Sequence, residues 1–313
     1  MRGIDLELGR LGLWNGVGTR EDGRAWLERL GRLVAELCDE WELRPGPAYG
    51  GGSGAWVAPV ALADGTGAVL KVGYPHREAR AEADGLRLWD GRGAVRLLRV
   101  DEERTAYLLE RCEPAQKLAA ADHIAPEQRL LIAAALLRRL WRPVEAAAGT
   151  RIESVAEQMG WWAGLAAERF GALAPGVDAG FVSTGISLLR SLPANAPTTV
   201  VLHGDCNPGN ILSAAREPWL AIDAKPLTGD PAFDPWPLLA QIDDPFALPR
   251  PASFLLARGK LLADALGLDL ARVFAWGAAK LVEMAVAEAA DGDHGRCAEL
   301  LAQARTVADL AGL

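Results

Sequence analysis

The chain has 313 residues, 50% of them hydrophobic, and a formal net charge of −8, so it is long enough to build two hydrophobic cores. The acidic balance argues against a nucleic-acid binder, which would need clustered Lys and Arg, and four Cys with no paired spacing argue against a zinc site or a disulfide framework. No segment has the layout of a signal peptide or the roughly 20 apolar residues of a membrane helix, so we expect a cytoplasmic protein without a membrane partner.

The N-terminal third of the chain predicts one helix followed by a small sheet. Apolar residues recur with helical spacing from Trp26 to Trp41, after a helix-start signal that begins at Thr19, so we expect a helix over residues 19–43. Strand-like segments follow at residues 56–62, 68–72, 95–100 and 106–109, with a helical stretch at 77–89. The remainder is mostly helical. This order predicts an α+β fold with a small strand-rich lobe and a larger helical lobe, divided near residues 111–114.

Lys71 lies within an otherwise apolar strand, where an ammonium group without a counter-charge would be costly. The helical stretch that follows offers two acids, Glu82 and, one turn earlier on the same face, Glu78. We expect Glu82 to be the partner and keep Glu78 as the alternative. The acid that does not pair with Lys71 would be an ordinary solvated side chain on the surface of the helix.

Two apolar strands in the middle of the chain each lead to an aspartate. The strand at residues 200–202 precedes Asp205, the strand Trp219–Ile222 ends in Asp223, and Asn210 lies between the two. An ordinary hydrophilic hairpin would also be rich in Asp, Asn, Pro and Gly, but it does not explain the second Asp at a strand end. One carboxylate can accept the proton of an attacking hydroxyl, while the amide oxygen and the other carboxylate hold Mg²⁺ on a nucleotide triphosphate. The pattern predicts a phosphotransfer site.

These residues resemble the catalytic and metal loops of the aminoglycoside phosphotransferase family, whose fold is similar to that of eukaryotic protein kinases. The segment 217–234, EPWLAIDAKPLTGDPAFD, narrows the resemblance to the branch of streptomycin 6-kinases and hydroxyurea-type kinases. The resemblance implies a protein-kinase-like fold of two lobes. It also implies that Asp205 is the catalytic residue, that Asn210 and Asp223 bind Mg²⁺, and that His203 supports the loop. Cys206-Asn207 stands where many relatives have Leu-His.

The resemblance further assigns residues to the binding of ATP. A Gly-rich turn precedes Lys71 by about one hairpin arm, as the loop over the phosphates does in kinases, although a plain hairpin turn would look the same. Backbone N–H groups of this turn would cradle the phosphates, and its residues are Gly51, Gly52, Ser53 and Gly54. The distance from Glu82 to the following Trp89-Asp90-Gly91 resembles the spacing of the family's Lys-pairing Glu. In the family's hinge, the carbonyl of Glu110 and the N–H of Cys112 would contact adenine.

Acidic residues in the C-terminal part are candidates for binding the acceptor. Asp230 precedes Pro231, which is a helix-start signal, so we expect Asp230 to cap the next helix, with substrate contact as the alternative. In relatives the C-terminal region binds substrate through acidic side chains. Glu283 and Glu288 are therefore substrate candidates, and a solvated helix face is the other interpretation of each.

Together these residues predict an enzyme that transfers the γ-phosphate of ATP, with Mg²⁺, to a hydroxyl group of a small polar molecule. Residues 1–111 would form the nucleotide-clasping lobe, and residues 112–313 the catalytic and acceptor-binding lobe. By the resemblance, the acceptor is a cationic, streptomycin-like aminoglycoside, and phosphorylation would confer antibiotic resistance; hydroxyurea and amino sugars such as glucosamine are the alternatives. A catalytically silent nucleotide-binding module is a further alternative, against which the complete set of Lys71, Asp205, Asn210 and Asp223 argues.

Overall fold

The computed structural model describes residues 21–50 and 54–313, which fall into two units divided between Ala115 and Gln116. The first unit combines an N-terminal helix with a five-stranded antiparallel sheet in the order β1-β2-β3-β5-β4. Its elements are α1 (Glu21–Glu40), β1 (Arg44–Pro45), β2 (Ala55–Ala61), β3 (Gly67–Gly73), a 3-10 turn (Arg77–Ala81), α2 (Glu82–Trp89), β4 (Leu97–Asp101) and β5 (Ala106–Glu110). The predicted strands and the predicted helical stretch at 77–89 are all present.

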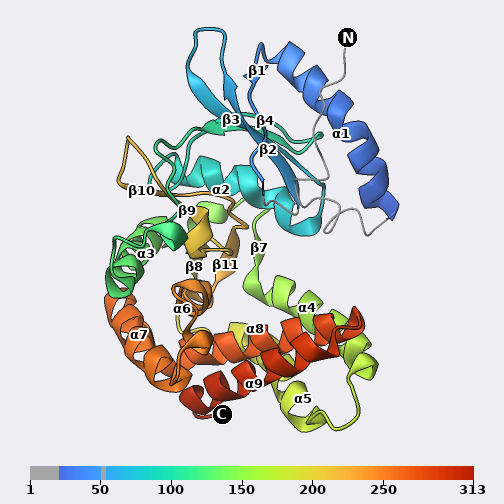
Figure 1. Ribbon diagram of the computed structural model, residues 1–313, viewed down its shortest axis with the longest axis vertical. Coiled ribbons are helices and arrows are strands. Elements are labelled where there is room, and N and C mark those ends of the chain that lie inside the picture. The colour runs from blue at the N-terminus through green and yellow to red at the C-terminus, as the bar shows by residue number, and fades with distance from the viewer. Residues whose placement is uncertain (1–20, 51–53) are drawn as a thin grey trace. The chain divides into compact units, whose positions relative to one another are not determined.

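Helix α1 covers one face of this sheet (Figure 1). Its buried residues, among them Leu30, Val34 and Leu37, recur every three or four positions and so form a single apolar stripe. Strand β2 alternates buried and half-buried residues, and its buried Trp56 and Val60 belong to the same core as the stripe of α1. Burial of each large apolar side chain contributes about 1.5–3 kcal/mol, which fixes α1 on the sheet. The predicted start of this helix at Thr19 lies outside the described residues.

The second unit is mostly helical, with short strands near its centre. Its helices are α3 (Pro126–Leu140), α4 (Val155–Arg169), α5 (Ala179–Ala194), α6 (Trp236–Gln241), α7 (Pro251–Leu266), α8 (Leu270–Ala290) and α9 (His294–Ala311). Its strands are β6 (Arg142–Pro143), β7 (Glu153–Ser154), β8 (Val200–Leu202), β9 (Ile211–Ser213), β10 (Trp219–Ala221) and β11 (Leu227–Gly229). Strands β6, β8, β11 and β7 form one sheet in that order, and β9 pairs with β10 as a separate antiparallel hairpin.

Helix α8 is the central element of this unit, and α9 returns alongside it (Figure 1). Large residues such as Phe274 and Val282 are fully buried on α8, and Gly277 lets the ring of Trp236 approach so closely that an added Cβ would lie 2.4 Å from it. The helix therefore has a fixed position relative to α6 and to the segment that precedes α6. No helix within residues 21–50 and 54–313 combines the length and the apolar character that a membrane span requires.

Candidate active site

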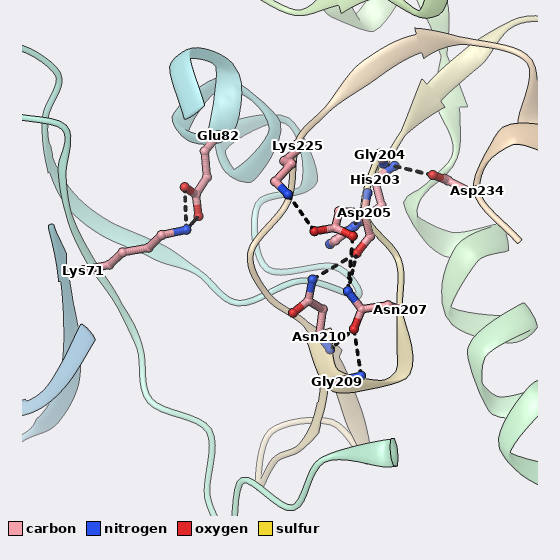
Figure 2. A network of polar contacts seen from close by, with 10 residues as sticks. All are labelled: Lys71, Glu82, His203, Gly204, Asp205, Asn207, Gly209, Asn210, Lys225 and Asp234. Carbon is pink, nitrogen blue, oxygen red and sulfur yellow. Dashed lines mark hydrogen bonds and ion pairs between the residues drawn. The ribbon is translucent and has the colours of Figure 1, made fainter. Parts of the chain in front are cut away.

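A buried ion pair lies in the first unit. Lys71, on the central strand β3, donates from Nζ to both carboxylate oxygens of Glu82 at 2.7 and 2.8 Å (Figure 2). Lys71 is 8% exposed and Glu82, the first residue of α2, is 3% exposed. The ring of Tyr107, opposite Lys71 on β5, lies 5.9 Å from the ammonium nitrogen. Of the two acids considered from the sequence, Glu82 thus forms this pair, and a buried pair of this kind holds a cation at a fixed point on the sheet.

The other nucleotide-binding candidates of this unit lie near the ends of its strands. Gly54 immediately precedes β2, and its carbonyl accepts a hydrogen bond from the N–H of Tyr74 at 2.9 Å, whereas Gly51, Gly52 and Ser53 lie outside the described residues. Glu110 ends β5, and its backbone N–H donates to the carbonyl of Arg96 at 2.9 Å. Cys112 is buried two residues further on. None of these contacts tests nucleotide binding, so the roles of Gly54, Glu110 and Cys112 in that binding stay predictions.

Asp205 follows a turn that tolerates only glycine at its centre. Strand β8 ends at Leu202, His203 is fully buried, and Gly204 has a φ of +82°, in the left-handed region. A Cβ on Gly204 would lie 1.8 Å from the carbonyl oxygen of Lys225, and the N–H of Lys225 donates to the carbonyl of His203 at 2.9 Å. The backbone of His203 and Gly204, just before Asp205, is therefore in direct contact with the backbone of Lys225.

The carboxylate of Asp205 is held by two side chains (Figure 2). Lys225 donates from Nζ to Oδ2 at 2.9 Å, and Asn207 donates from Nδ2 to Oδ1 at 3.2 Å. Asn210 donates from Nδ2 to the backbone carbonyl of Asp205 at 3.0 Å. Asn207 also caps the turn that follows, because its Oδ1 accepts from the N–H groups of Gly209 and Asn210. Neither Lys225 nor Asn207 was among the site residues expected from the sequence.

Asn210 and Asp223 lie at the same end of the β9–β10 hairpin. Ile211 pairs with Ala221, and the N–H of Ile222 donates to the carbonyl of Asn210 at 2.9 Å, so Asp223 follows directly. The hydrogen bond from Nδ2 of Asn210 orients its amide, and Asp223 has a φ of +56°, an uncommon conformation that often marks a functional position. An amide oxygen and a carboxylate are the hard ligands that Mg²⁺ takes together with nucleotide phosphates. The residues therefore fit this ion.

The buried carboxylate of Asp234 holds the turn before Asp205 through hydrogen bonds to its backbone. Asp234 is 1% exposed and accepts from the N–H groups of His203 and Gly204 at 3.1 and 2.9 Å. The indole N–H of Trp141 donates to it at 3.0 Å. Burial lowers the pKa of the His203 imidazole, although the charges of nearby aspartates act in the opposite direction. The side chain of His203 is fully buried beside this turn, and its role in supporting the loop stays a prediction.

Asp230 is a second buried carboxylate in the same segment. It is 1% exposed, caps the 3-10 turn Pro231–Phe233 through the N–H of Ala232, and accepts from Arg272 Nε and Trp276 Nε1, both at 2.6 Å. Three protein donors occupy this carboxylate. Of the two roles considered from the sequence, this geometry supports the structural one.

The two C-terminal candidates have different surroundings, although both belong to α8. Glu283 is half-buried and follows Trp276 and Lys280 by seven and three residues, so it shares their face of the helix. Lys280 donates from Nζ to the carbonyl of Phe233 at 2.9 Å and lies 3.4 Å from the centre of the Phe233 ring. Glu288 acts electrostatically on Arg296 at the start of α9. Of the two, Glu283 is thus on the helix face that packs against the Asp230–Asp234 segment.

The thiol of Cys206, next to Asp205, is not a nucleophile. Burial raises its pKa well above the ordinary value, and the charges of Asp234 and Asp205 raise it further. The same cause, burial, raises the pKa of Cys38 to about 11. Neither raised pKa favours a reactive thiolate.

Comparisons with known proteins agree with these observations. The family model described as aminoglycoside/hydroxyurea antibiotic resistance kinase matches residues 40–292. A streptomycin 6-kinase of Streptomyces glaucescens is 37% identical over 273 residues, which make up 87% of each chain. A hydroxyurea phosphotransferase of Kitasatospora aureofaciens is 38% identical over 273 residues, or 87% of this chain and 76% of the relative.

Solved structures share the fold. Choline kinase LicA from Streptococcus pneumoniae aligns over 90% of this chain and 99% of its own with a TM-score of 0.59 at 13% identity. The GDP complex of an aminoglycoside 2'-phosphotransferase-IIIa mutant aligns over 88% of this chain and 96% of its own with a TM-score of 0.60 at 14% identity. The predicted protein-kinase-like fold is confirmed. The family match and the identity to the curated relatives together confirm the predicted membership: this chain belongs to the aminoglycoside/hydroxyurea antibiotic resistance kinases, and it is a small-molecule phosphotransferase.

Proposed function

We propose that this kinase transfers the γ-phosphate of ATP, with Mg²⁺, to a hydroxyl group of streptomycin or a close aminocyclitol. The observation that carries the proposal is the convergence of Asp205, Asn210 and Asp223 at the ends of β8 and the β9–β10 hairpin. These three residues belong to a chain that is 37% identical to two Streptomyces streptomycin 6-kinases. Because ATP is the phosphate donor, the proposal also implies a cytoplasmic enzyme.

In this proposal, residues 1–111 clasp the nucleotide. Lys71, held by Glu82, would attract the phosphates, and the turn Gly51–Gly54 would donate backbone N–H groups to them. The carbonyl of Glu110 and the N–H of Cys112 would contact adenine. The buried and fixed ammonium of Lys71 suits the binding of phosphates, because a charge in a rigid position needs little reorganisation of its surroundings during the transfer.

Residues 112–313 would bind the acceptor and carry the transfer step. The acceptor oxygen forms a bond to the γ-phosphorus, the bond between that phosphorus and the bridging oxygen breaks, and the electron pair leaves on ADP. The carboxylate of Asp205, oriented by Lys225 and Asn207, accepts the hydroxyl proton. Asn210 and Asp223 would hold Mg²⁺, which neutralises phosphate charge. Positioning and charge neutralisation supply most of the barrier lowering.

The acceptor class rests on charge. The chain carries a net charge of −8, and Glu283 is placed on the face of α8 that packs against the Asp230–Asp234 segment. Guanidinium and ammonium groups of an aminocyclitol would pair with such carboxylates. Hydroxyurea is the second candidate, since a hydroxyurea phosphotransferase is 38% identical to this chain. Hydroxyurea is neutral, so its binding would not depend on acidic side chains.

The proposal is tested with purified enzyme, Mg²⁺-ATP and a panel of streptomycin, other aminocyclitols, hydroxyurea and glucosamine, with products identified by mass spectrometry. We expect a phosphorylated aminocyclitol, and a KM for it that rises with ionic strength because exposed charge pairs are screened. Phosphorylation of hydroxyurea or glucosamine with every aminocyclitol unchanged would make the acceptor assignment wrong. ATP hydrolysis without any phosphorylated acceptor would contradict all three acceptor classes.

A further inference from the structure

Lys225 forms an ion pair with the proposed catalytic carboxylate of Asp205. Its Nζ lies 2.9 Å from Oδ2 of Asp205, and it comes from the connection between β10 and β11, two residues after Asp223 (Figure 2). The same short connection therefore supplies a proposed metal ligand and an ammonium group. No other Lys or Arg pairs with Asp205 among the ion pairs of the described residues.

Folding stability alone does not account for this pair. The side chain of Lys225 is 36% exposed and that of Asp205 is 27% exposed, and a pair so accessible to water contributes little net stability. The structure nevertheless fixes it closely. The carbonyl of Lys225 would lie 1.8 Å from a Cβ at Gly204, and its N–H donates to His203, so the backbones that carry the two charges cannot move apart independently. Such fixed geometry is what electrostatic stabilisation of a reaction requires.

We propose that Lys225 is a catalytic residue that stabilises the transferring phosphoryl group, an inference that rests on the proposed kinase function. Before transfer, its ammonium orients Asp205 through Oδ2. During transfer, the acceptor proton passes to the Asp205 carboxylate, the γ-phosphoryl group moves from ATP to the acceptor oxygen with ADP as the leaving group, and the ammonium group stays in place. It contacts the phosphoryl oxygens, whose charge is spread over three atoms in a loose transition state.

This assignment differs from a role confined to positioning Asp205. A positioning residue would affect only reactions that need the proton acceptor in its place. A residue that contacts the phosphoryl group would also affect the slow hydrolysis of ATP that occurs without any acceptor, since water then receives the same phosphoryl group. The two roles can therefore be separated by measuring both reactions on the same variants and acceptor-free hydrolysis also in an Asp205→Ala background, where an effect of Lys225→Met can no longer act through the carboxylate.

The test compares Lys225→Met and Lys225→Arg with wild type, and uses Lys260→Met, an exposed position on α7, as the matched control. Acceptor phosphorylation and acceptor-free ATP hydrolysis are both measured as kcat and KM, and thermal unfolding shows whether each variant is folded. We expect Lys225→Met to lower kcat of both reactions by on the order of 10²-fold, with both KM values within about threefold of wild type. Lys225→Arg should recover at least about tenfold, because the guanidinium keeps the charge. Lys260→Met should match wild type.

Three results would overturn the inference: kcat of Lys225→Met within about threefold of wild type, no recovery in Lys225→Arg, or transfer lost while acceptor-free hydrolysis is unchanged. If wild-type enzyme phosphorylates no acceptor, the proposed function fails, but acceptor-free hydrolysis by the same variants still decides the role of Lys225.

Discussion

Replacement of Gly204 by Ala should distort the turn that precedes Asp205, because this position has no room for a methyl group. The new Cβ would lie 1.8 Å from the carbonyl oxygen and 2.8 Å from the carbonyl carbon of Lys225. The backbone of one segment must therefore retreat by about 1 Å or more, since a packed interior does not absorb such an overlap. The hydrogen bond from the N–H of Lys225 to the carbonyl of His203 would be lost with that movement.

The magnitude follows from three contributions. A left-handed conformation costs a residue with a Cβ about 1–2 kcal/mol, a lost hydrogen bond about 1 kcal/mol, and overpacking about 1–3 kcal/mol. We expect Gly204→Ala to lower the free energy of unfolding by about 3–6 kcal/mol. Because Asp205 is the next residue, a shift of about 1 Å should also lower kcat by on the order of 10²-fold.

Gly176→Ala is the matched control for this prediction. Gly176 has a φ of +92°, close to that of Gly204, but an added Cβ would meet nothing within 4 Å. It should show the conformational cost alone, about 1–2 kcal/mol, and wild-type kcat. Urea denaturation and steady-state kinetics of both variants provide the measurement. Equal destabilisation of the two variants, with kcat of Gly204→Ala unchanged, would refute the close contact between the turn and Lys225.

Three further predictions concern buried charges. Glu82→Gln removes the carboxylate that neutralises Lys71 and should destabilise the first unit by about 3 kcal/mol in urea denaturation, whereas Glu78→Gln should cost less; the reverse order would contradict the pairing. Asp230→Ala leaves three donors, on Ala232, Arg272 and Trp276, without their hydrogen-bond partner and should cost about 3–5 kcal/mol. The KM for the phosphate-accepting substrate should not change in this variant, and a specific rise in that KM would support the substrate role instead. Burial lowers the pKa of Lys280 to about 8, so the unfolded chain holds this proton to higher pH than the folded one. As the pH rises from 8 to 10, the free energy of unfolding of wild type should therefore increase by about 2 kcal/mol relative to that of Lys280→Arg. Equal pH profiles of the two proteins would contradict the lowered pKa of Lys280.

Local sequence signals were sufficient for strands β2 to β5 and for the helical stretch at 77–89 in the first unit. The strand-like segment 56–62 predicted β2, and the Asp230-Pro231 pair predicted a helix cap, which the structure shows on a short 3-10 turn, because both signals depend on residues adjacent in the chain. The acid that pairs with Lys71 was narrowed to two positions one helical turn apart. The spacing from Glu82 to Trp89 favoured Glu82 over Glu78, and the ion pair of Lys71 with Glu82 agrees with that expectation.

Local sequence signals could not predict the contacts between loops that lie far apart in the chain. Lys225 reaches Asp205 across 20 residues of sequence, and Trp141 reaches Asp234 across 93, so neither contact follows from periodicity or turn chemistry. Lys225 did carry one signal, its place two residues after Asp223 in a segment assigned to the metal site. Lys280 gave none, because a lysine on a long helix is usually solvated, and its position over Phe233 depends on how α8 packs.

The central claim is that Asp205 engages the acceptor hydroxyl, and the most direct measurement compares ATP binding with phosphoryl transfer in Asp205→Ala. Asp264→Ala, an exposed position on α7, is the control. We expect titration calorimetry with Mg²⁺ to give a Kd for ATP within about threefold of wild type, while kcat for phosphorylation of the acceptor falls by at least about 10²-fold. Near-normal kcat in Asp205→Ala with an acceptor that wild type phosphorylates would contradict the account.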